Sequence, residues 1–364
     1  MIKFFDLYNQ DKKLHKSILK KIEKLFNRGD FVLGNEVKIF EEKFRKFCKA
    51  KFAVSCANGT DALTIALKSL NLPKNSEVIV PAMTYCSTVF SIIEANLKPV
   101  LIDIGYLSST LSIKELKKKI NKKTKVIIPV HLYGSVADLK EIRKLIKNRN
   151  IYLIDDCAQA HGAYEDGSKP YKKIGSGTDI SCFSLYPGKN LGAYGDAGII
   201  TTNNINFYKR LRKLRNLGSE EKFNHDLVGM NSRLDTIQAI VLNEKFKNLN
   251  TYNHSRNKIA KFYDKNIRNP KIQKIKYSKY CVYHQYIILV EKRDGLIELL
   301  NKKKIQYGFH YPKAIHQLGA FKKQFNKKRY KNAEKIAENS ISLPIDPNLK
   351  TKQLKEITQV LNNF

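Results

Sequence analysis

The sequence has no paired cysteines, no long apolar runs and no metal-binding histidine motif, and each absence argues against a class of protein. Its six cysteines are scattered without a C-x-x-C pair, which argues against a zinc site and a disulfide framework and fits a reducing cytoplasm. No H-E-x-x-H motif occurs, so we predict no metal site. No run approaches the roughly 18 apolar residues of a membrane-spanning helix. The first residues soon become polar and charged and lack a secretory signal, so we expect a cytoplasmic protein without a membrane partner.

Acidic residues are also scarce, with 33 Asp and Glu against 67 Lys and Arg, which gives a net charge of +34. Such an excess first suggests a nucleic-acid-binding protein. However, 55 of the basic residues are Lys and only 12 are Arg, and they are spread along the chain without a basic tail. Base readers and phosphate clamps rely on the bidentate guanidinium of Arg. We therefore interpret the charge as a solvated, Lys-rich surface and expect no nucleic-acid partner.

The apolar residues, 42% of 364, are sufficient for a large core and are arranged in a strand–helix alternation. Apolar runs lie at Phe52–Cys56, Val78–Pro81, Pro99–Ile104, Val126–Val130, Ile151–Ile154, Ile180–Leu185 and Ile199–Thr202, with helical stretches near 60–70, 86–96, 112–120, 137–148 and 204–217. This pattern predicts an α/β fold with a mostly parallel central sheet covered by helices on both faces. Ligands of such sheets bind beyond the carboxyl ends of the strands.

The C-terminal third has a different pattern. A long helical stretch from Asn231 to about Asp264 leads to a strand at Val282–Val290 and to further helices near 293–303, 328–339 and 351–361. We predict a large domain over residues 1–250 and a smaller C-terminal α+β domain over residues 251–364. A helix rather than a flexible tether joins them, so we expect the two to pack closely.

Two segments place polar residues at predicted strand ends. Asn58-Gly59-Thr60-Asp61 follows one strand and opens a helix, whose free N–H groups and dipole favour an anion. By itself the motif is a weak signal, and an ordinary capped turn explains it somewhat better. Asp155 and Asp156 end another strand, so their side chains point to opposite faces and only one can face a cleft. That carboxylate could bind a metal, act as a base, hold a protonated ring nitrogen, or cap a helix.

Two further candidates are a lysine and a histidine. Lys189 follows an apolar strand and a Pro-Gly turn and precedes a stretch of small residues, whereas most other lysines lie in polar runs. Burial there would lower its pKa and make the amine a usable nucleophile, although a surface lysine beside a turn is an equal alternative. His131 closes the strand Val126–Val130 and could equally be a core histidine.

In this order the segments resemble the DegT/DnrJ/EryC1/StrS family of sugar aminotransferases, over essentially the whole chain. The resemblance is carried by N-G-T-D-A-L, P-A-M-T-Y, H-L-Y-G, D-D-C-A-Q-A-H-G-A, F-S-L-Y-P-G-K-N-L-G-A-Y-G-D-A-G and G-M-N-S-R-L-D-T-I-Q-A. It implies the aspartate aminotransferase fold (fold type I) and pyridoxal 5′-phosphate, with pyridoxamine 5′-phosphate in the second half-reaction. Relatives that dehydrate their substrate carry His in place of this Lys, so Lys189 favours amino transfer.

The resemblance also implies catalytic roles for Lys189 and Asp156. Lys189 would bind the cofactor covalently and later move a proton between substrate and cofactor, and Asp156 would keep the pyridinium nitrogen protonated. The remaining cofactor contacts would be Gln159 to the ring hydroxyl, Tyr85 stacked on the ring, Gly59, Thr60 and Ser184 at the phosphate, and Asn231 at the phosphate of a neighbouring subunit. The last contact implies a homodimer with shared active sites.

The C-terminal part resembles the branch that aminates C-3 of nucleotide-linked 3-keto-6-deoxyhexoses. Phe309-His310-Tyr311-Pro312 carries this likeness, with Phe309 where Ile or Val is usual. His310 and Tyr311 would lie near the sugar nucleotide, although Tyr311-Pro312 could simply shape a loop, and Arg233 could face the same entrance. We expect amino transfer from L-glutamate to a dTDP-linked keto sugar, for glycan biosynthesis. The alternative is a C-4 aminotransferase acting on a UDP-, GDP- or dTDP-4-keto sugar.

Overall fold

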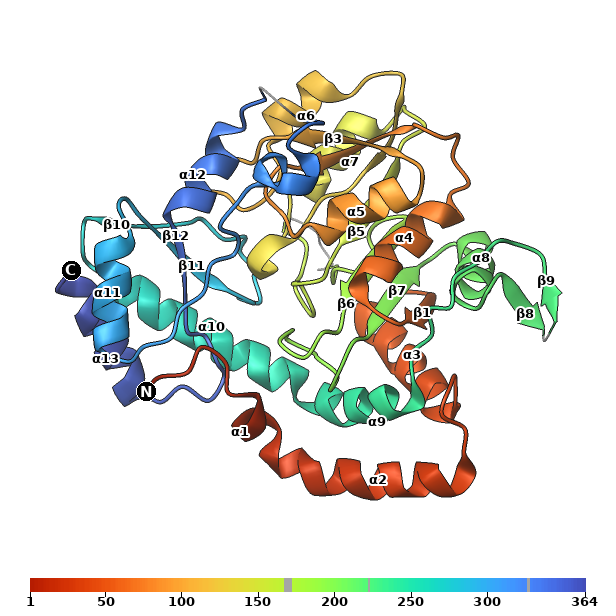
Figure 1. Cartoon of the computed structure of the whole chain (residues 1–364), viewed down its shortest axis with the longest axis horizontal. Coiled ribbons are helices and arrows are strands. Elements are labelled where there is room, and N and C mark those ends of the chain that lie inside the picture. Colours follow the sequence, from red (N-terminus) through yellow and green to blue (C-terminus); the bar gives the residue numbers. More distant parts are fainter. Residues whose placement is uncertain (167–171, 222, 326–327) are drawn as a thin grey trace.

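A computed structural model of the chain describes residues 1–166, 172–221, 223–325 and 328–364 (Figure 1). The strands are β1 (Phe52–Cys56), β2 (Glu77–Pro81), β3 (Lys98–Ile102), β4 (Thr124–Ile127), β5 (Tyr152–Asp156), β6 (Ile180–Ser184), β7 (Gly198–Thr202), β8 (Ser219–Glu221), β9 (Asn224–His225), β10 (Ile272–Lys274), β11 (Tyr286–Val290) and β12 (Ser340–Leu343). The apolar runs of the sequence therefore correspond closely to the strands.

Helices alternate with these strands. The α-helices are α1 (Leu7–Asp11), α2 (His15–Arg28), α3 (Asn35–Cys48), α4 (Gly59–Ser69), α5 (Ser87–Glu94), α6 (Ile113–Lys119), α7 (Leu139–Ile146), α8 (Ile205–Arg215), α9 (Thr236–Lys245), α10 (Leu249–Asn266), α11 (Asp294–Lys302), α12 (Lys331–Asn339) and α13 (Thr351–Asn362). Short 3-10 turns are η1 (Lys12–Leu14), η2 (Leu132–Gly134), η3 (Phe246–Asn248), η4 (Ile315–Gln317) and η5 (Gly319–Phe321).

Seven strands form the large sheet in the order β1-β7-β6-β5-β4-β2-β3. The pairings from β6 through β5, β4 and β2 to β3 are all parallel, whereas β7 runs antiparallel to both β6 and β1. The predicted mostly parallel sheet is thus confirmed. Since the parallel strands point the same way, their carboxyl ends meet at one edge of the sheet.

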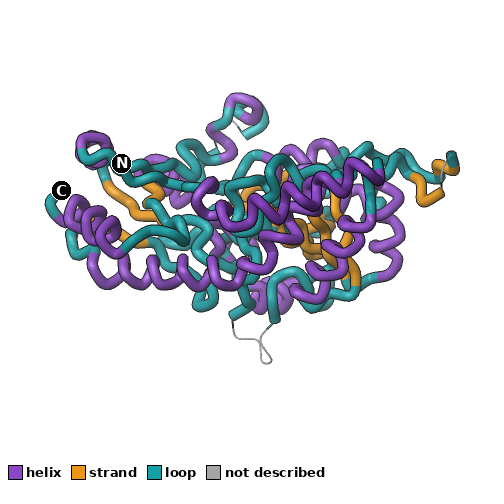
Figure 2. Tube along the Cα trace, turned by 90° about the horizontal axis from the view of Figure 1, so that it is seen from below, coloured by secondary structure: helices purple, strands orange, loops and turns teal. Residues whose placement is uncertain are grey.

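Helices cover both faces of this sheet, as the fully apolar strands predicted (Figure 2). Alternate residues of each strand enter different clusters, because successive side chains point to opposite faces. On β6, Cys182 packs with α4, α5 and α8, whereas Phe183 packs with α3, α7 and α9. The Phe183 ring lies 4.9 Å from the Phe44 ring of α3 in an edge-on contact. The two layers hold the strand ends, and hence the site, in fixed positions.

A three-stranded antiparallel sheet, β10-β11-β12, forms a second core with α10, α11 and α13 (left side of Figure 1). Ile2 also packs in this core and pairs with Ile305, so the first residues lie against the C-terminal part. The domain boundary at residue 250 stays a prediction.

Two predicted elements begin later than expected. The long helix starts at Thr236 rather than Asn231, because the backbone of residues 231–235 is engaged elsewhere: Ser232 N–H donates to Arg215 and Asn231 pairs with Asn216. The strand predicted at Val282–Val290, β11, starts at Tyr286 rather than Val282, since the preceding residues bond to the loop after β4. Long-range contacts of this kind leave no periodic signal in the sequence.

The β8–β9 hairpin projects from the end of the molecule and was not predicted (Figures 1 and 2). Val228, just after it, is 96% exposed. Among the helices of the described residues, none is long and apolar enough to cross a membrane.

Candidate active site

A cavity of about 750 Å³ lies at the carboxyl ends of the parallel strands. It brings together nine of the residues singled out in the sequence: Gly59, Thr60, Tyr85, Asp156, Gln159, Ser184, Lys189, His310 and Tyr311. They come from segments more than 250 residues apart. The cavity thus lies at the edge of the sheet where the sequence predicted the binding site, and binding there stays a prediction.

The N-terminus of α4 forms one wall of the cavity. Asn58 caps the helix by accepting the N–H of Asp61 at 2.8 Å. Gly59 approaches β6 so closely that an added Cβ would lie 2.5 Å from the Cβ of Ser184. The Thr60 hydroxyl donates to Ser87 at 2.7 Å. Free helix N–H groups and several hydroxyls thus converge where a phosphate group fits.

Asp155 and Asp156 point to opposite faces of β5, as predicted. Asp156 is 5% exposed and lines the cavity, where its carboxylate accepts hydrogen bonds from the Thr88 hydroxyl at 2.8 Å and from the Ala158 N–H at 3.1 Å. Burial raises the pKa of Asp156, and these two hydrogen bonds oppose the rise. A carboxylate with such support can hold a protonated ring nitrogen.

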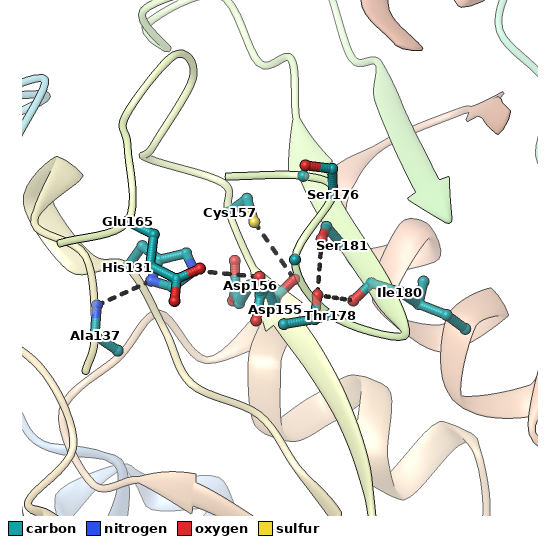
Figure 3. A network of polar contacts seen from close by, with 12 residues as sticks. His131, Ala137, Asp155, Asp156, Cys157, Glu165, Ser176, Thr178, Ile180 and Ser181 are labelled. Carbon is teal, nitrogen blue, oxygen red and sulfur yellow. Dashed lines mark hydrogen bonds and ion pairs between the residues drawn. The ribbon is translucent and has the colours of Figure 1, made fainter. Parts of the chain in front are cut away.

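Asp155 meets His131 on the other face of the strand (Figure 3). His131 is fully buried, with Nε2 3.5 Å from the Asp155 carboxylate and Nδ1 accepting the Ala137 N–H at 3.1 Å. It does not line the cavity, so the interpretation as a core histidine holds. Cys157 lies beside this pair, with its ligand atom within 4.8 Å of theirs, and burial raises the pKa of its thiol well above the usual value.

Lys189 enters the cavity from the turn after β6, where its N–H bonds to the Tyr186 carbonyl at 2.9 Å. Its side chain is partly exposed because it faces the cavity. Burial nevertheless lowers the pKa of Lys189 to about 8, while the nearby Asp156 charge acts in the opposite direction. An amine with this pKa is partly neutral at ordinary pH and can attack a carbonyl carbon.

Gln159 is held by two tyrosines. Its side-chain oxygen accepts the Tyr133 N–H at 2.6 Å and its amide nitrogen donates to the Tyr311 hydroxyl at 3.0 Å. The Tyr133 hydroxyl in turn donates to the His310 carbonyl. The predicted cofactor contact Gln159 and the predicted substrate contacts His310 and Tyr311 therefore belong to one network. Burial lowers the pKa of His310 to about 4, so its ring is neutral.

Two predicted residues lie outside this cavity lining. Asn231 is exposed, and the Arg233 guanidinium donates to Asn216 at 3.2 Å. Both follow the projecting hairpin. Their neighbour Ser232 is fully buried: it donates to Asp61 of α4 at 2.6 Å and accepts the Ala57 N–H at 3.1 Å. Their predicted roles, at a second subunit and at the substrate, remain predictions.

The cavity lining also includes residues to which the sequence assigned no role, among them Phe5, Thr88, Tyr186 and His284; His284 had only been part of the likeness to the C-3 branch. Tyr186 and Thr88 stand two or three positions from residues already singled out, so their proximity was the available signal. No sequence signal marked Phe5, because its position in the cavity depends on the pairing of the N-terminal segment, at Ile2, with Ile305. A cavity that combines a lysine amine, a buried carboxylate and a helix N-terminus is typical of pyridoxal-phosphate transferases.

Comparison with known proteins agrees. The DegT/DnrJ/EryC1/StrS aminotransferase family matches residues 12–362, so the chain belongs to this family. It is 36% identical to a dTDP-3-amino-3,6-dideoxy-α-D-galactopyranose transaminase from Aneurinibacillus thermoaerophilus, over 100% of this chain and 99% of the relative. It is also 36% identical to a UDP-N-acetyl-3-dehydro-α-D-glucosamine 3-aminotransferase from Acidithiobacillus ferrooxidans, over 96% of this chain and 94% of the relative. The crystal structure of S. venezuelae DesV with a ketimine intermediate superposes on this chain with a TM-score of 0.95 at 32% sequence identity. The match covers 100% of this chain and 98% of that structure.

The chain is thus a pyridoxal-phosphate-dependent aminotransferase of nucleotide-linked keto sugars. The residues present fit the cofactor: the N-terminus of α4 lines the cavity together with Gly59 and Ser184, where a phosphate would find free N–H groups, and Asp156 offers a buried carboxylate. When bound, pyridoxal phosphate supplies a carbonyl carbon and an electron-withdrawing ring. Its solved relatives and the fold class agree with the predictions from sequence.

The first prediction concerns pH. In cofactor-free protein, the rate at which Lys189 captures pyridoxal phosphate covalently should rise with pH and level off above a midpoint of about 8, because the protonated amine cannot attack. Borohydride reduction followed by mass spectrometry measures the captured fraction. A midpoint near 10.5, the ordinary lysine value, contradicts the lowered pKa.

The second prediction concerns the proposed phosphate site at the N-terminus of α4, beside Gly59 and Ser184. Gly59→Ala should weaken cofactor binding about ten-fold or more, because its Cβ would collide with Ser184 and widen the site. Fluorescence titration with pyridoxamine phosphate measures the affinity. Gly319→Ala is the matched control, since nothing lies within 4 Å of its added Cβ. Equal affinities of the two variants would argue against a phosphate at α4.

Proposed function

We propose that the enzyme transfers an amino group from L-glutamate to C-3 of a dTDP-linked 3-keto-6-deoxyhexose. The product would be a dTDP-3-amino-3,6-dideoxyhexose for glycan biosynthesis, made in the cytoplasm. The observation that carries the proposal is the end-to-end 36% identity to a dTDP-3-amino-3,6-dideoxyhexose transaminase. The relative acting on a UDP-sugar is as similar but also aminates C-3, which supports the position more strongly than the nucleotide.

Lys189 and Asp156 would be the catalytic residues. We assign Lys189 the covalent attachment and then the proton transfers at the reacting carbon, since its lowered pKa lets the amine both take up and release a proton near neutral pH. Asp156 would hold the ring nitrogen in its protonated form. Gln159 would donate its amide N–H to the ring hydroxyl oxygen, Tyr85 would stack on the ring, and Gly59, Thr60 and Ser184 would hold the phosphate.

His310 and Tyr311 would orient the sugar. Both line the same cavity as Asp156, and the Tyr311 ring lies 5.5 Å from the Tyr85 ring. Tyr133 bonds to His310 and Gln159 bonds to Tyr311, which fixes both residues relative to the proposed cofactor contacts. A sugar bound by His310 and Tyr311 would therefore hold its carbonyl in a fixed position relative to the Lys189 amine. Arg233 would approach the nucleotide from the entrance.

The enzyme would work as a homodimer with shared sites. The projecting hairpin and the exposed Val228 lead directly to Asn231, which is exposed and lies outside the cavity lining of its own chain. An arm of this kind can reach a second copy, and in a two-fold dimer each copy would donate Asn231 to the cofactor phosphate of the other.

The third prediction tests the substrate. Purified enzyme with glutamate and a dTDP-3-keto-6-deoxyhexose should release 2-oxoglutarate and yield a C-3 amino sugar, whereas Lys189→Ala should be inactive because it lacks the amine. Mass spectrometry and NMR of the product identify the amination position. Amination at C-4, or preference for a UDP- or GDP-4-keto sugar, would replace this proposal with the C-4 alternative.

The fourth prediction tests the shared site. Lys189→Ala and Asn231→Ala, each poorly active alone, should regain about a quarter of wild-type activity when unfolded together and refolded as a mixture. Half of the dimers would then be hybrids, and each hybrid would hold one intact site. If Lys189 and Asn231 serve the same subunit's site, the hybrid has no intact site and the mixture stays inactive.

A further inference from the structure

Thr88 is a fully buried residue of α5 whose hydroxyl touches the side chain of Asp156. Its Oγ1 lies 2.8 Å from Asp156 Oδ2, 2.8 Å from the Thr84 hydroxyl and 3.2 Å from the Tyr85 carbonyl oxygen. Thr84 is itself 2% exposed. Both threonines line the cavity. The comparisons and the sequence motifs leave these two hydroxyls without a role.

The direction of these hydrogen bonds follows from counting protons. A hydroxyl has one hydrogen to donate, and an ionised carboxylate can only accept. The hydrogen bond to the charged oxygen is the strongest of the three that Thr88 can make, so Thr88 donates to Asp156. Thr84 must then donate to Thr88, because the Thr88 hydrogen is already used. The chain runs from Thr84 through Thr88 to the carboxylate, and it stabilises the ionised form.

We propose that Thr84 and Thr88 form a hydroxyl chain that keeps Asp156 ionised and aimed into the cavity, so that the shared proton stays on the cofactor ring nitrogen. This inference rests on the proposed role of Asp156. Thr88 is a positioning residue: it acts through the carboxylate and leaves the reacting carbon to Lys189.

The balance at Asp156 shows why the chain matters. Burial favours the protonated carboxyl, and the two hydrogen bonds, from Thr88 and from the Ala158 N–H, oppose it. The ionisable groups close enough to interact electrostatically with Asp156 are Lys189 and Tyr311, which line the cavity, and His131, Cys157 and Cys182, which do not. The Ala158 contact is a backbone contact that remains in every variant. Loss of the Thr88 hydroxyl therefore moves the proton from the ring toward Asp156.

The test uses the holoenzyme reconstituted with ¹⁵N-labelled pyridoxal phosphate. In wild type, the ring nitrogen should show the NMR shift of a protonated pyridinium. In Thr88→Val, which keeps the shape but loses the hydroxyl, the signal should move toward that of neutral pyridine. The rate of the glutamate half-reaction should fall about ten-fold or more, the usual effect of losing a hydrogen bond to a charged group. Thr88→Ser should restore both.

Two further variants complete the test. Thr84→Val leaves the Thr88–Asp156 contact in place and should give a smaller change in the same direction. Thr358→Val is the matched control, because the partners of this buried hydroxyl of α13 among the described residues are two helix carbonyls, of Leu354 and Lys355, to one of which it donates. It should leave the nitrogen signal and the rate unchanged.

The outcomes separate the two claims. A wild-type ring nitrogen that is already neutral would overturn the proposed role of Asp156 itself. A protonated wild-type nitrogen that stays protonated in both Thr88→Val and Thr84→Val would overturn the hydroxyl chain alone. Should Thr88→Val fail to fold, Thr84→Val still decides, because an unshifted signal in that variant contradicts the chain.

Discussion

Taking a carboxylate out of water raises its pKa unless hydrogen bonds and opposite charges compensate. Asp156 bears this constraint at the end of β5, in the interior of the large sheet. Its two hydrogen-bond donors and the nearby Lys189 make the ionised form possible, and the same ionised form keeps Lys189 from losing its proton altogether. The proposed chemistry of the site depends on this mutual support between a buried acid and an amine that faces the cavity.

The fold supplies that arrangement through a few rigid contacts. Parallel strands bring Asp156 and the turn that carries Lys189 to one edge, and α4 directs its N-terminus to the same place. The C-terminal part closes the cavity with the loop of His310 and Tyr311, which the Tyr133–Gln159 contacts fasten to the large sheet. The proposed cofactor contact Gln159 and the proposed substrate contacts His310 and Tyr311 therefore belong to one hydrogen-bond network. A substitution at either group should alter the position of the other.

Much of this could be predicted from the sequence where the signal is local. Apolar runs located the strands, the paired Asp155–Asp156 implied that only one side chain faces the cleft, and the small neighbours of Lys189 marked it among 55 lysines. The late start of α9, the entry of Phe5 into the cavity and the contact of Thr88 with Asp156 could not be predicted, because each depends on backbone or side-chain partners distant in the chain. The large positive charge first suggested a nucleic-acid-binding protein. Of the 67 Lys and Arg residues, only Lys189 has a catalytic role in the proposed chemistry.

The central claim is that one cavity holds the cofactor between α4, Asp156 and Lys189. A crystal structure of the enzyme with pyridoxal phosphate and a dTDP-linked amino sugar tests it most directly. The phosphate should lie at the N-terminus of α4 beside Gly59 and Ser184, the ring nitrogen within hydrogen-bond distance of Asp156, and Lys189 within reach of the reacting carbon. A phosphate bound elsewhere, or a ring nitrogen facing away from Asp156, would contradict it.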